Sequence, residues 1–336
     1  MKIKSLHIDN FKSLIDFKLI EPNPFSVFVG ANGVGKSNIF EALEFFNYKN
    51  FNSFNEVDSL FGGYENFVNA NSYKKGLSIR IASNDGIDDL CLGLHISPYK
   101  DRNILPGNAV EGITKINTEN VKNSALPFHN KFIKNFSRVF INSKEGNRVN
   151  LTSNKKLNFN CNNVADVLKR LLNEPLVGLE IKEWLQILRP GFSKIEIEND
   201  LSSKAVIQFY ENGYDKPFGE NLISDGTRNI LCILTAIYQT KEPQFICIEE
   251  PENGLNPYVI KEMVTFFREQ CRDKGHYIWL NTHSQTLVNQ LNAEEIIVVN
   301  KEEGITKANQ IKNKNLHGLA LDEAWLTNTL GGGVPW

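Results

Sequence analysis

The stretch that decides the fold of this chain is Gly30-Ala31-Asn32-Gly33-Val34-Gly35-Lys36-Ser37, which has the pattern G-x-x-x-x-G-K-S. Residues 25–29 before it are mostly apolar and predict a short buried strand, and residues 38–46 after it predict a helix. Glycines let backbone N–H groups turn toward one point, and a helix N-terminus carries partial positive charge. A strand, a glycine-rich turn and a helix start therefore predict a cradle for phosphate groups.

The motif assigns roles to its polar residues. Lys36 is expected to reach the β- and γ-phosphates of a nucleotide, and the Ser37 hydroxyl is expected to sit on Mg²⁺. We expect the remaining contacts of this loop with the nucleotide to come from Gly30, Asn32, Gly33, Gly35 and Asn38. The alternative is a glycine-rich turn that binds nothing. The full motif between a strand and a helix favours a nucleotide-binding chain.

Composition narrows the class of protein. The chain has 336 residues, 41% of them hydrophobic and 23% charged, which is typical of one large or two ordinary globular domains. The net charge of −2 gives no overall signal for DNA or membrane binding. The five cysteines form no C-x-x-C pair, which argues against a zinc site and fits a reducing cytosol. No signal peptide or membrane-spanning run is predicted, so we expect a cytoplasmic location.

Apolar periodicity indicates an α/β order with a different segment in its middle. Strands are expected at 2–9, 25–29, 77–81, 90–96, 195–197, 206–210, 244–248, 277–280 and 296–299. Helices are expected at 38–46, 164–172, 181–188, 227–238, 257–271 and 285–290. We therefore expect residues 1–99 and 193–336 to form the two parts of one core, and residues 100–192 to form an inserted, mainly helical subdomain. The tail 331–336 receives no prediction.

The inserted segment is basic. Residues 100–170 contain 13 Lys and Arg against 5 Asp and Glu, a local excess of +8 in a chain whose net charge is −2. Such clustering is disfavoured by self-repulsion unless an anionic partner offsets it. One interpretation is a platform for nucleic acid or for an acidic effector protein, with Lys131, Lys134 and Arg138 among its residues. The other is a solvated face, or salt bridges to acidic residues of the same chain.

A second group of polar residues follows two predicted strands. Glu249 and Glu250 end the apolar strand at 244–248, and His283 follows the strand at 277–280. One carboxylate at a strand end can hold Mg²⁺ through water and the next can polarise an attacking water, so Glu249 is predicted on the metal side and Glu250 as general base. His283 is expected at the same sheet edge, directed at the γ-phosphate. The alternatives are a solvated strand end and a structural histidine.

A further anion site is predicted at the start of the helix at 227–238. Ser224 and Gly226 precede this helix, where backbone N–H groups and the helix dipole favour negative charge. Caps of this type are common, so the signal is weak alone. One chain needs only one γ-phosphate cradle. A second one makes sense if it closes over the nucleotide of another subunit.

The order of these motifs resembles the ABC-type ATPases of the SMC, Rad50 and RecF group. It is most similar to the short RecF-like ATPases of OLD-type and Septu-type bacterial anti-phage systems. The resemblance implies a P-loop NTPase of the ABC-type head class that uses ATP and Mg²⁺. It implies that Ser224 and Gly226 are the signature, that 252–255 is the D-loop and that His283 is the switch. Lys12 takes the place where this group often has a basic residue near the phosphates.

The resemblance also implies partners. We expect a homodimer or higher oligomer that closes on ATP and controls a separate effector, most simply a nuclease, in anti-phage defence. DNA or RNA is a further candidate ligand, and no membrane is expected. Too few residues follow the last predicted strand for the Toprim nuclease of OLD proteins, so the nuclease is expected to be another chain.

Several departures from the group's pattern leave alternatives open. Residues 224–227, Ser-Asp-Gly-Thr, are not the transporter signature, Glu249 replaces the usual Asp, and no Q-loop glutamine or zinc hook is recognisable. A RecF- or SMC-like DNA-repair ATPase keeps the same chemistry in another pathway. A non-hydrolysing, nucleotide-dependent scaffold is a second alternative. A transporter ATPase fits poorly because of the insert and the signature.

Overall fold

The computed structural model describes residues 2–71, 76–84, 89–96, 135–141, 155–312, 319, 321–327 and 329–330. The chain forms two units, one of residues 1–136 with 291–336 and the other of residues 137–290. Both units mix helices and strands, in agreement with the predicted α/β class. The boundaries expected from the sequence, after residues 99 and 192, stay a prediction.

The first unit contains a four-stranded antiparallel sheet in the order β2-β1-β4-β5. Its strands are β1 (Lys2–Asp9), β2 (Phe17–Ile20), β4 (Leu77–Asn84) and β5 (Asp89–Ile96). Leu6 of β1 pairs with Leu19 of β2 on one side and with Ile81 of β4 on the other. The strands predicted at 77–81 and 90–96 are β4 and β5, which pair antiparallel, and residues 85–88 lie outside the described residues.

The same unit carries the predicted strand–loop–helix. β3 (Phe25–Val29) is buried throughout and is followed by the loop and by α1 (Lys36–Lys49), whose Phe40 packs edge-on against Phe28 of β3 at 5.4 Å between ring centroids. β3 pairs in parallel with β12 (Ile296–Glu302), a strand far from it in the sequence. The first unit therefore holds the loop between a buried strand and a buried helix face.

The prediction that residues 296–299 form the last strand is wrong. β12 turns at residues 303–304 and continues as β13 (Ile305–Gln310), which pairs with it antiparallel. Glu303 and Gly304 have φ values of +49° and +81°, as a tight two-residue hairpin requires. The polar side chains of β13 hid this strand from the search for apolar alternation.

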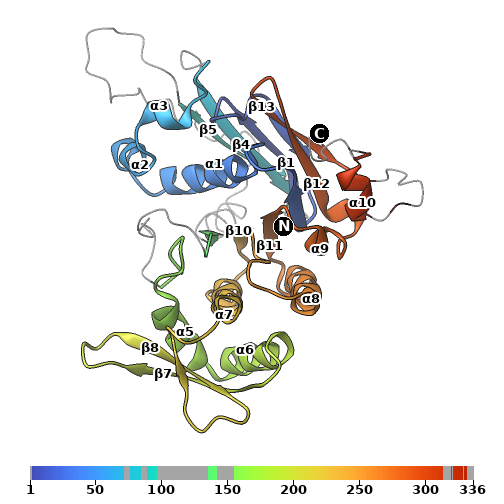
Figure 1. The fold of residues 1–336 in the computed structure, drawn as a ribbon. Coiled ribbons are helices and arrows are strands. Elements are labelled where there is room, and N and C mark those ends of the chain that lie inside the picture. The colour runs from blue at the N-terminus through green and yellow to red at the C-terminus, as the bar shows by residue number, and fades with distance from the viewer. Residues whose placement is uncertain are drawn as a thin grey trace. The chain divides into compact units, whose positions relative to one another are not determined.

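Two short helices that the sequence did not predict follow α1. They are α2 (Phe54–Leu60) and α3 (Tyr64–Phe67), which follow α1 in the ribbon (Figure 1). Ser53 and Glu56 form a capping box at the start of α2, which stabilises a helix too short to display a hydrophobic face. The described part of this unit also contains η1 (Ala293–Glu295) and α10 (Leu321–Leu326).

The second unit is built around two parallel strands, β10 (Phe245–Glu249) and β11 (Tyr277–Thr282). Every residue of both strands is buried, as is typical of parallel strands covered on both faces. β6 (Phe136–Val139) lies beside β10 and was not predicted, because four residues within a basic segment give no pattern. The predicted helices around them are α7 (Asp225–Tyr238), α8 (Pro257–Lys274) and α9 (Gln285–Val288).

Among the described residues, the rest of this unit consists of two helices and a small sheet, which can be followed in Figure 1. These elements are α5 (Val164–Leu172), α6 (Pro175–Leu188), β7 (Phe192–Asn199), β8 (Ala205–Glu211) and β9 (Phe218–Gly219). α5 has the predicted bounds, whereas α6 begins six residues before the predicted 181, at a proline suited to the first helical position. Trp184 of α6 packs on Phe266 of α8 at 4.6 Å between centroids.

Within the described part of the basic segment at 100–170, the basic side chains are not all exposed to solvent. Lys131 and Lys134 lie outside the described residues. Arg138 lies in β6 with 9% of its surface exposed, and Lys156 is 8% exposed. Burial lowers the pKa of Lys156 to about 8. The interpretation of Arg138 as a member of a surface patch is therefore wrong, because a count of charges carries no information about burial.

None of the described helices combines the length and the apolar composition that crossing a membrane requires. The tail at 331–336 lies outside the described residues.

Candidate nucleotide-binding and active site

The glycine-rich loop adopts the backbone conformation that its motif predicts. Gly33 and Gly35 have φ values of +77° and +101°, and α1 begins directly after Gly35 with no side chain capping its N-terminus. A Cβ at Gly30 would lie 2.3 Å from the Val299 carbonyl oxygen, and one at Gly35 would lie 2.1 Å from Thr306 Oγ1. Close packing therefore demands glycine at both positions, and the backbone forms a cradle that fits phosphate. Asn32 is exposed in this loop.

Lys36 folds back over the loop. Its Nζ donates to the carbonyl oxygens of Gly30 at 2.7 Å and Ala31 at 2.9 Å. The ammonium group is thus held above the cradle by weak neutral acceptors. Phosphate oxygens would be stronger partners, because hydrogen bonds between two charged groups are shorter and stronger than those to a neutral carbonyl. This arrangement suits the role predicted for Lys36.

A polar strut supports the loop from β13. Thr306 Oγ1 lies 2.7 Å from the Val34 carbonyl oxygen and 2.6 Å from Ser13 Oγ, and both hydroxyls are buried in this contact. Asn38 Nδ2 donates to Ser13 Oγ at 2.7 Å, so the amide predicted to line the nucleotide also anchors the helix start. Neither Thr306 nor Ser13 was predicted as part of the site, because nothing in their local sequence marks them.

Lys12 lies close to α1. Its backbone has a φ of +48°, and its Nζ forms an ion pair of 2.6 Å with Glu41 Oε2, a carboxylate that is 7% exposed. The predicted role of Lys12 near the phosphates stays a prediction. The contact with Glu41 accounts for a lysine at this position even without nucleotide.

In the second unit, Glu249 ends β10 with 4% of its surface exposed. Its Oε1 accepts from Arg138 Nε at 2.7 Å and lies 2.5 Å from a terminal guanidinium nitrogen of the same arginine. Its Oε2 accepts from Asn281 Nδ2 at 3.1 Å. The carboxylate that the sequence places on the metal side therefore already has a buried cation on one oxygen. In this arrangement Glu249 does not fit a ligand of Mg²⁺.

Glu250 and His283 lie together, as the shared sheet edge predicts. Glu250 has a φ of +48°, so the chain turns sharply after β10, and Asn253 Nδ2 donates to Glu250 Oε2 at 3.0 Å. Glu250 Oε1 lies 3.4 Å from His283 Nδ1. The side chains are 31% and 45% exposed. A positioned carboxylate beside an imidazole at a strand end has the composition of an acid–base pair.

Beneath this pair lies a buried carboxylate. Thr282 Oγ1 donates to Glu252 Oε1 and accepts from the Ser284 backbone N–H at 2.9 Å. Burial raises the pKa of Glu252. The turn after β10 and the end of β11 are thus joined through the Thr282 hydroxyl, next to His283 in the chain.

The predicted signature and D-loop pack against each other. Ser224 caps α7 by accepting from the Thr227 N–H at 3.2 Å. A Cβ at Gly226 would lie 2.3 Å from the Gly254 carbonyl oxygen. Asn229 Nδ2 donates to the carbonyl oxygens of Pro251 at 2.7 Å and Asn253 at 2.8 Å, which ties α7 to the turn after β10.

A depression of about 250 Å³ opens at this contact, with Ser224, Gly226 and Gly254 in its lining. Arg189 also lines it. The Arg189 side chain donates from Nε to Thr227 Oγ1 at 3.0 Å and pairs with Glu211 at 2.6 Å. Arg189 was not predicted as a site residue, and its place beside the signature follows from the fold.

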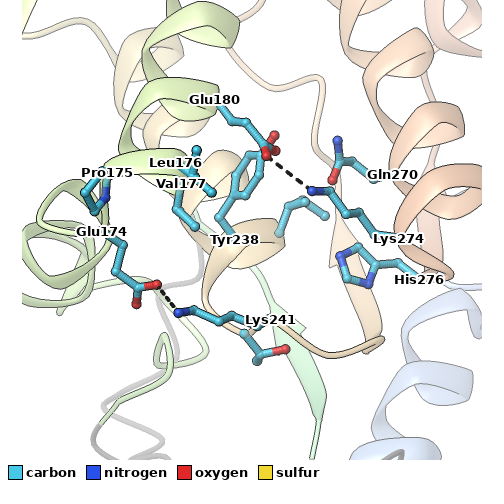
Figure 2. A pocket seen from close by; sticks show the side chains of 12 residues that line it. Glu174, Pro175, Leu176, Val177, Glu180, Tyr238, Lys241, Gln270, Lys274 and His276 are labelled. Carbon is cyan, nitrogen blue, oxygen red and sulfur yellow. Dashed lines mark hydrogen bonds and ion pairs between the residues drawn. The ribbon is translucent and has the colours of Figure 1, made fainter.

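A larger pocket of about 330 Å³ lies elsewhere in the second unit, at the start of α6 (Figure 2). Two ion pairs flank it, Lys241 with Glu174 at 2.8 Å and Lys274 with Glu180 at 3.2 Å. None of the predicted site residues lines this pocket. It is therefore separate from the candidate site. Among the described residues, no group of three or more His, Cys, Asp or Glu could hold a metal ion.

Solved structures share this fold. The SMC head domain from Thermotoga maritima matches with a TM-score of 0.52 and 13% identity over 93% of this chain and 100% of that one. An SMC head bound to the C-winged helix domain of ScpA matches with a TM-score of 0.56 and 16% identity, covering 96% and 98%. An SMC head with an extended coiled coil bound to the C-terminal domain of ScpA, derived from Pyrococcus furiosus, matches at 0.56 and 15% with the same coverage.

These likenesses establish the fold of an SMC-type P-loop ATPase head, as the resemblance of the motifs implied. No curated protein has a matching sequence. The family model described as "AAA domain, putative AbiEii toxin, Type IV TA system" matches residues 25–289, which include the loop, the acidic strand end and His283. Since this match covers most of the chain, the protein belongs to that AAA domain family of P-loop ATPases.

Proposed function

We propose that the chain binds ATP with Mg²⁺ at residues 30–37 and hydrolyses it, with Glu250 as general base and His283 as the residue that responds to the γ-phosphate. The observation that carries the proposal is the contact of 3.4 Å between Glu250 Oε1 and His283 Nδ1 at the ends of two parallel strands. Both side chains are accessible to water, as the activation of an attacking water requires. Lys36 and Ser37 supply the cation and the hydroxyl for the phosphates and Mg²⁺.

The chemistry asked of Glu250 fits its surroundings. Asn253 holds one carboxylate oxygen and leaves the other facing His283, so the carboxylate keeps one orientation. A proton taken from water by Glu250 can be shared with the imidazole. Glu250, Asn253 and His283 all belong to the second unit.

We further propose that ATP closes two copies of the chain on each other. Ser224 and Gly226 line a depression that offers the positive end of α7 to an anion, and they belong to the unit that lacks the P-loop. This supports a role toward the nucleotide of a second copy. Asn229 ties α7 to the turn that follows Glu250, so closure at the signature can reach the general base.

The output we propose is control of a separate effector protein, a nuclease, in bacterial anti-phage defence. Two of the similar SMC heads are bound to domains of ScpA, which supports a head that acts on another protein. The family description names a toxin of a toxin–antitoxin system, which favours a conflict system over chromosomal repair. Binding of DNA or RNA by the basic segment remains part of this proposal and would be weakened steeply by salt.

One observation favours a second candidate, a nucleotide-dependent scaffold that does not hydrolyse ATP. The Arg138 guanidinium forms an ion pair with the carboxylate of Glu249, the residue that the sequence predicts on the metal side. A slow or absent phosphate release by the wild-type protein, with ATP binding intact, would support the scaffold. Steady turnover that Glu250→Gln abolishes would exclude it.

The test of the proposed function uses two variants and their mixture. Lys36→Ala removes the cation of the loop, and Ser224→Arg blocks the signature with a bulky side chain. Each alone should be inactive in ATP hydrolysis. A mixed dimer has one site with both defects and one with neither, so the mixture should recover activity. If the mixture stays as inactive as its components while both variants remain folded, the arrangement in trans is wrong.

A further inference from the structure

The carboxylate of Glu249 is part of a buried cluster that the proposed function does not use. Arg138 Nε and a terminal nitrogen contact the same oxygen, Oε1, at 2.7 and 2.5 Å, and Asn281 donates to Oε2 at 3.1 Å. The side chains of Arg138 and Glu249 are 6% and 3% exposed. The Arg138 guanidinium also lies over the Phe159 ring, 4.8 Å from its centroid.

This geometry is unfavourable for a metal ion at Glu249. A cation at 2.5 Å neutralises the carboxylate, and a divalent ion approaching the same group would be repelled by the guanidinium in a poorly screened interior. Arginine cannot give up its proton to relieve that repulsion. Metal binding at Glu249 would therefore require Arg138 to move out of a packed site, where it lies in the buried strand β6 and over an aromatic ring.

We propose that Glu249 is the counter-ion of Arg138 and not a ligand of Mg²⁺, and that Arg138 is a positioning residue that anchors the end of β10 to β6. Arg138 comes from β6 and Glu249 from β10, the neighbouring strand, so the pair joins two strands at the point where the chain turns into Glu250. This inference rests on the proposed function, since it concerns which residues serve Mg²⁺ with ATP. It leaves Ser37 as the metal-side residue of the loop.

A buried ion pair behaves as a unit. Removing one partner leaves the other charge without compensation in the interior, whereas replacing both by neutral groups of similar size often costs little. Arg138→Met and Glu249→Gln should each lower the thermal unfolding midpoint, and the double variant should recover most of the loss. The exposed pair Lys274 and Glu180 is the matched control, because such pairs contribute little to stability. Its double variant should show no comparable recovery.

The decisive measurement is the Mg²⁺ concentration that half-saturates binding of a fluorescent ATP analogue. The double variant Arg138→Met with Glu249→Gln should need Mg²⁺ within about threefold of wild type, because no ligand has been lost. Ser37→Ala should need at least about tenfold more. Glu249→Gln alone, which keeps an oxygen able to accept from Arg138, repeats the test in a near-isosteric background if the double variant does not fold.

The outcomes separate the two proposals. If wild type binds no nucleotide, or if Ser37→Ala and Lys36→Ala change nothing, the proposed function fails. If those controls behave as expected and the Glu249 variants raise the Mg²⁺ requirement as much as Ser37→Ala, Glu249 serves the metal and this inference is overturned. It is also overturned if the double variant is no more stable than the less stable single variant.

Discussion

A methyl group added at Gly35 tests the strut beneath the phosphate loop. Gly35 and Gly33 both have positive φ, so alanine at either position should cost about 1–2 kcal/mol of backbone strain. At Gly35 the new Cβ would also lie 2.1 Å from Thr306 Oγ1 and 2.7 Å from Ser13 Oγ, whereas at Gly33 nothing lies within 4 Å. Displacing the two hydroxyls breaks hydrogen bonds worth roughly 1 kcal/mol each. Gly35→Ala should therefore cost about 3–4 kcal/mol, some 2 kcal/mol more than Gly33→Ala.

The assay is guanidinium denaturation followed by circular dichroism, with Gly33→Ala as the matched control. Thr306→Ala removes the closer of the two hydroxyls that the new Cβ would strike and leaves Ser13 Oγ at 2.7 Å. In that background Gly35→Ala should cost the backbone strain and about 1 kcal/mol more, which gives a coupling of about 1 kcal/mol between the two positions. Equal losses of unfolding free energy in the two glycine variants would refute the support of the loop by Thr306 and Ser13. Additive losses for Gly35→Ala and Thr306→Ala would refute it as well. Nucleotide binding, measured in parallel, should fall with Gly35→Ala more than with Gly33→Ala.

Three further predictions address charge and chemistry. Lys36→Ala removes the cation expected to face the β- and γ-phosphates, whose Nζ hydrogen-bonds to two carbonyl oxygens of its own loop, and should weaken ATP binding by about 100-fold in calorimetry. Glu250→Gln should keep ATP binding but lower phosphate release by about 100- to 10,000-fold; release at the wild-type rate would exclude Glu250 as the base. His276 has its pKa lowered to about 4 by burial, so the folded protein holds it neutral while the unfolded chain protonates below about pH 6.5. The stabilisation from the neutral His276 is therefore present above that pH, and the free energy of unfolding should fall by about 2 kcal/mol between pH 7 and pH 5. Denaturation of His276→Asn at the same two pH values should show a smaller fall.

Local patterns predicted the elements that hold the candidate site. The phosphate loop, β3 and α1 follow from one motif between two apolar stretches, and α5 has the predicted bounds at both ends. Glu250 and His283 were expected at one sheet edge because parallel strands end on the same side, and they lie 3.4 Å apart. These predictions succeed because the pattern that marks each element lies in residues close in sequence.

The elements that were missed have weak local signals. β13 is a polar hairpin partner of β12, β6 has four residues, and α2 and α3 are too short to show a helical period. Such elements exist because a neighbouring strand or the packing of aromatic rings supports them. Their sequences alone do not distinguish them from loops.

The sequence by itself determined the P-loop class, the α/β order and the residue types available for chemistry. Only the tertiary structure decided which of those residues meet. Arg138 and Glu249 are 111 positions apart, and Ser13 and Thr306 are 293 apart, yet each pair is in direct contact. The sequence predicts that Arg138 is exposed at the surface, because most arginine side chains are exposed. Its burial against Glu249 arises from strand pairing and packing, which depend on the whole unit and leave no mark in the residues on either side.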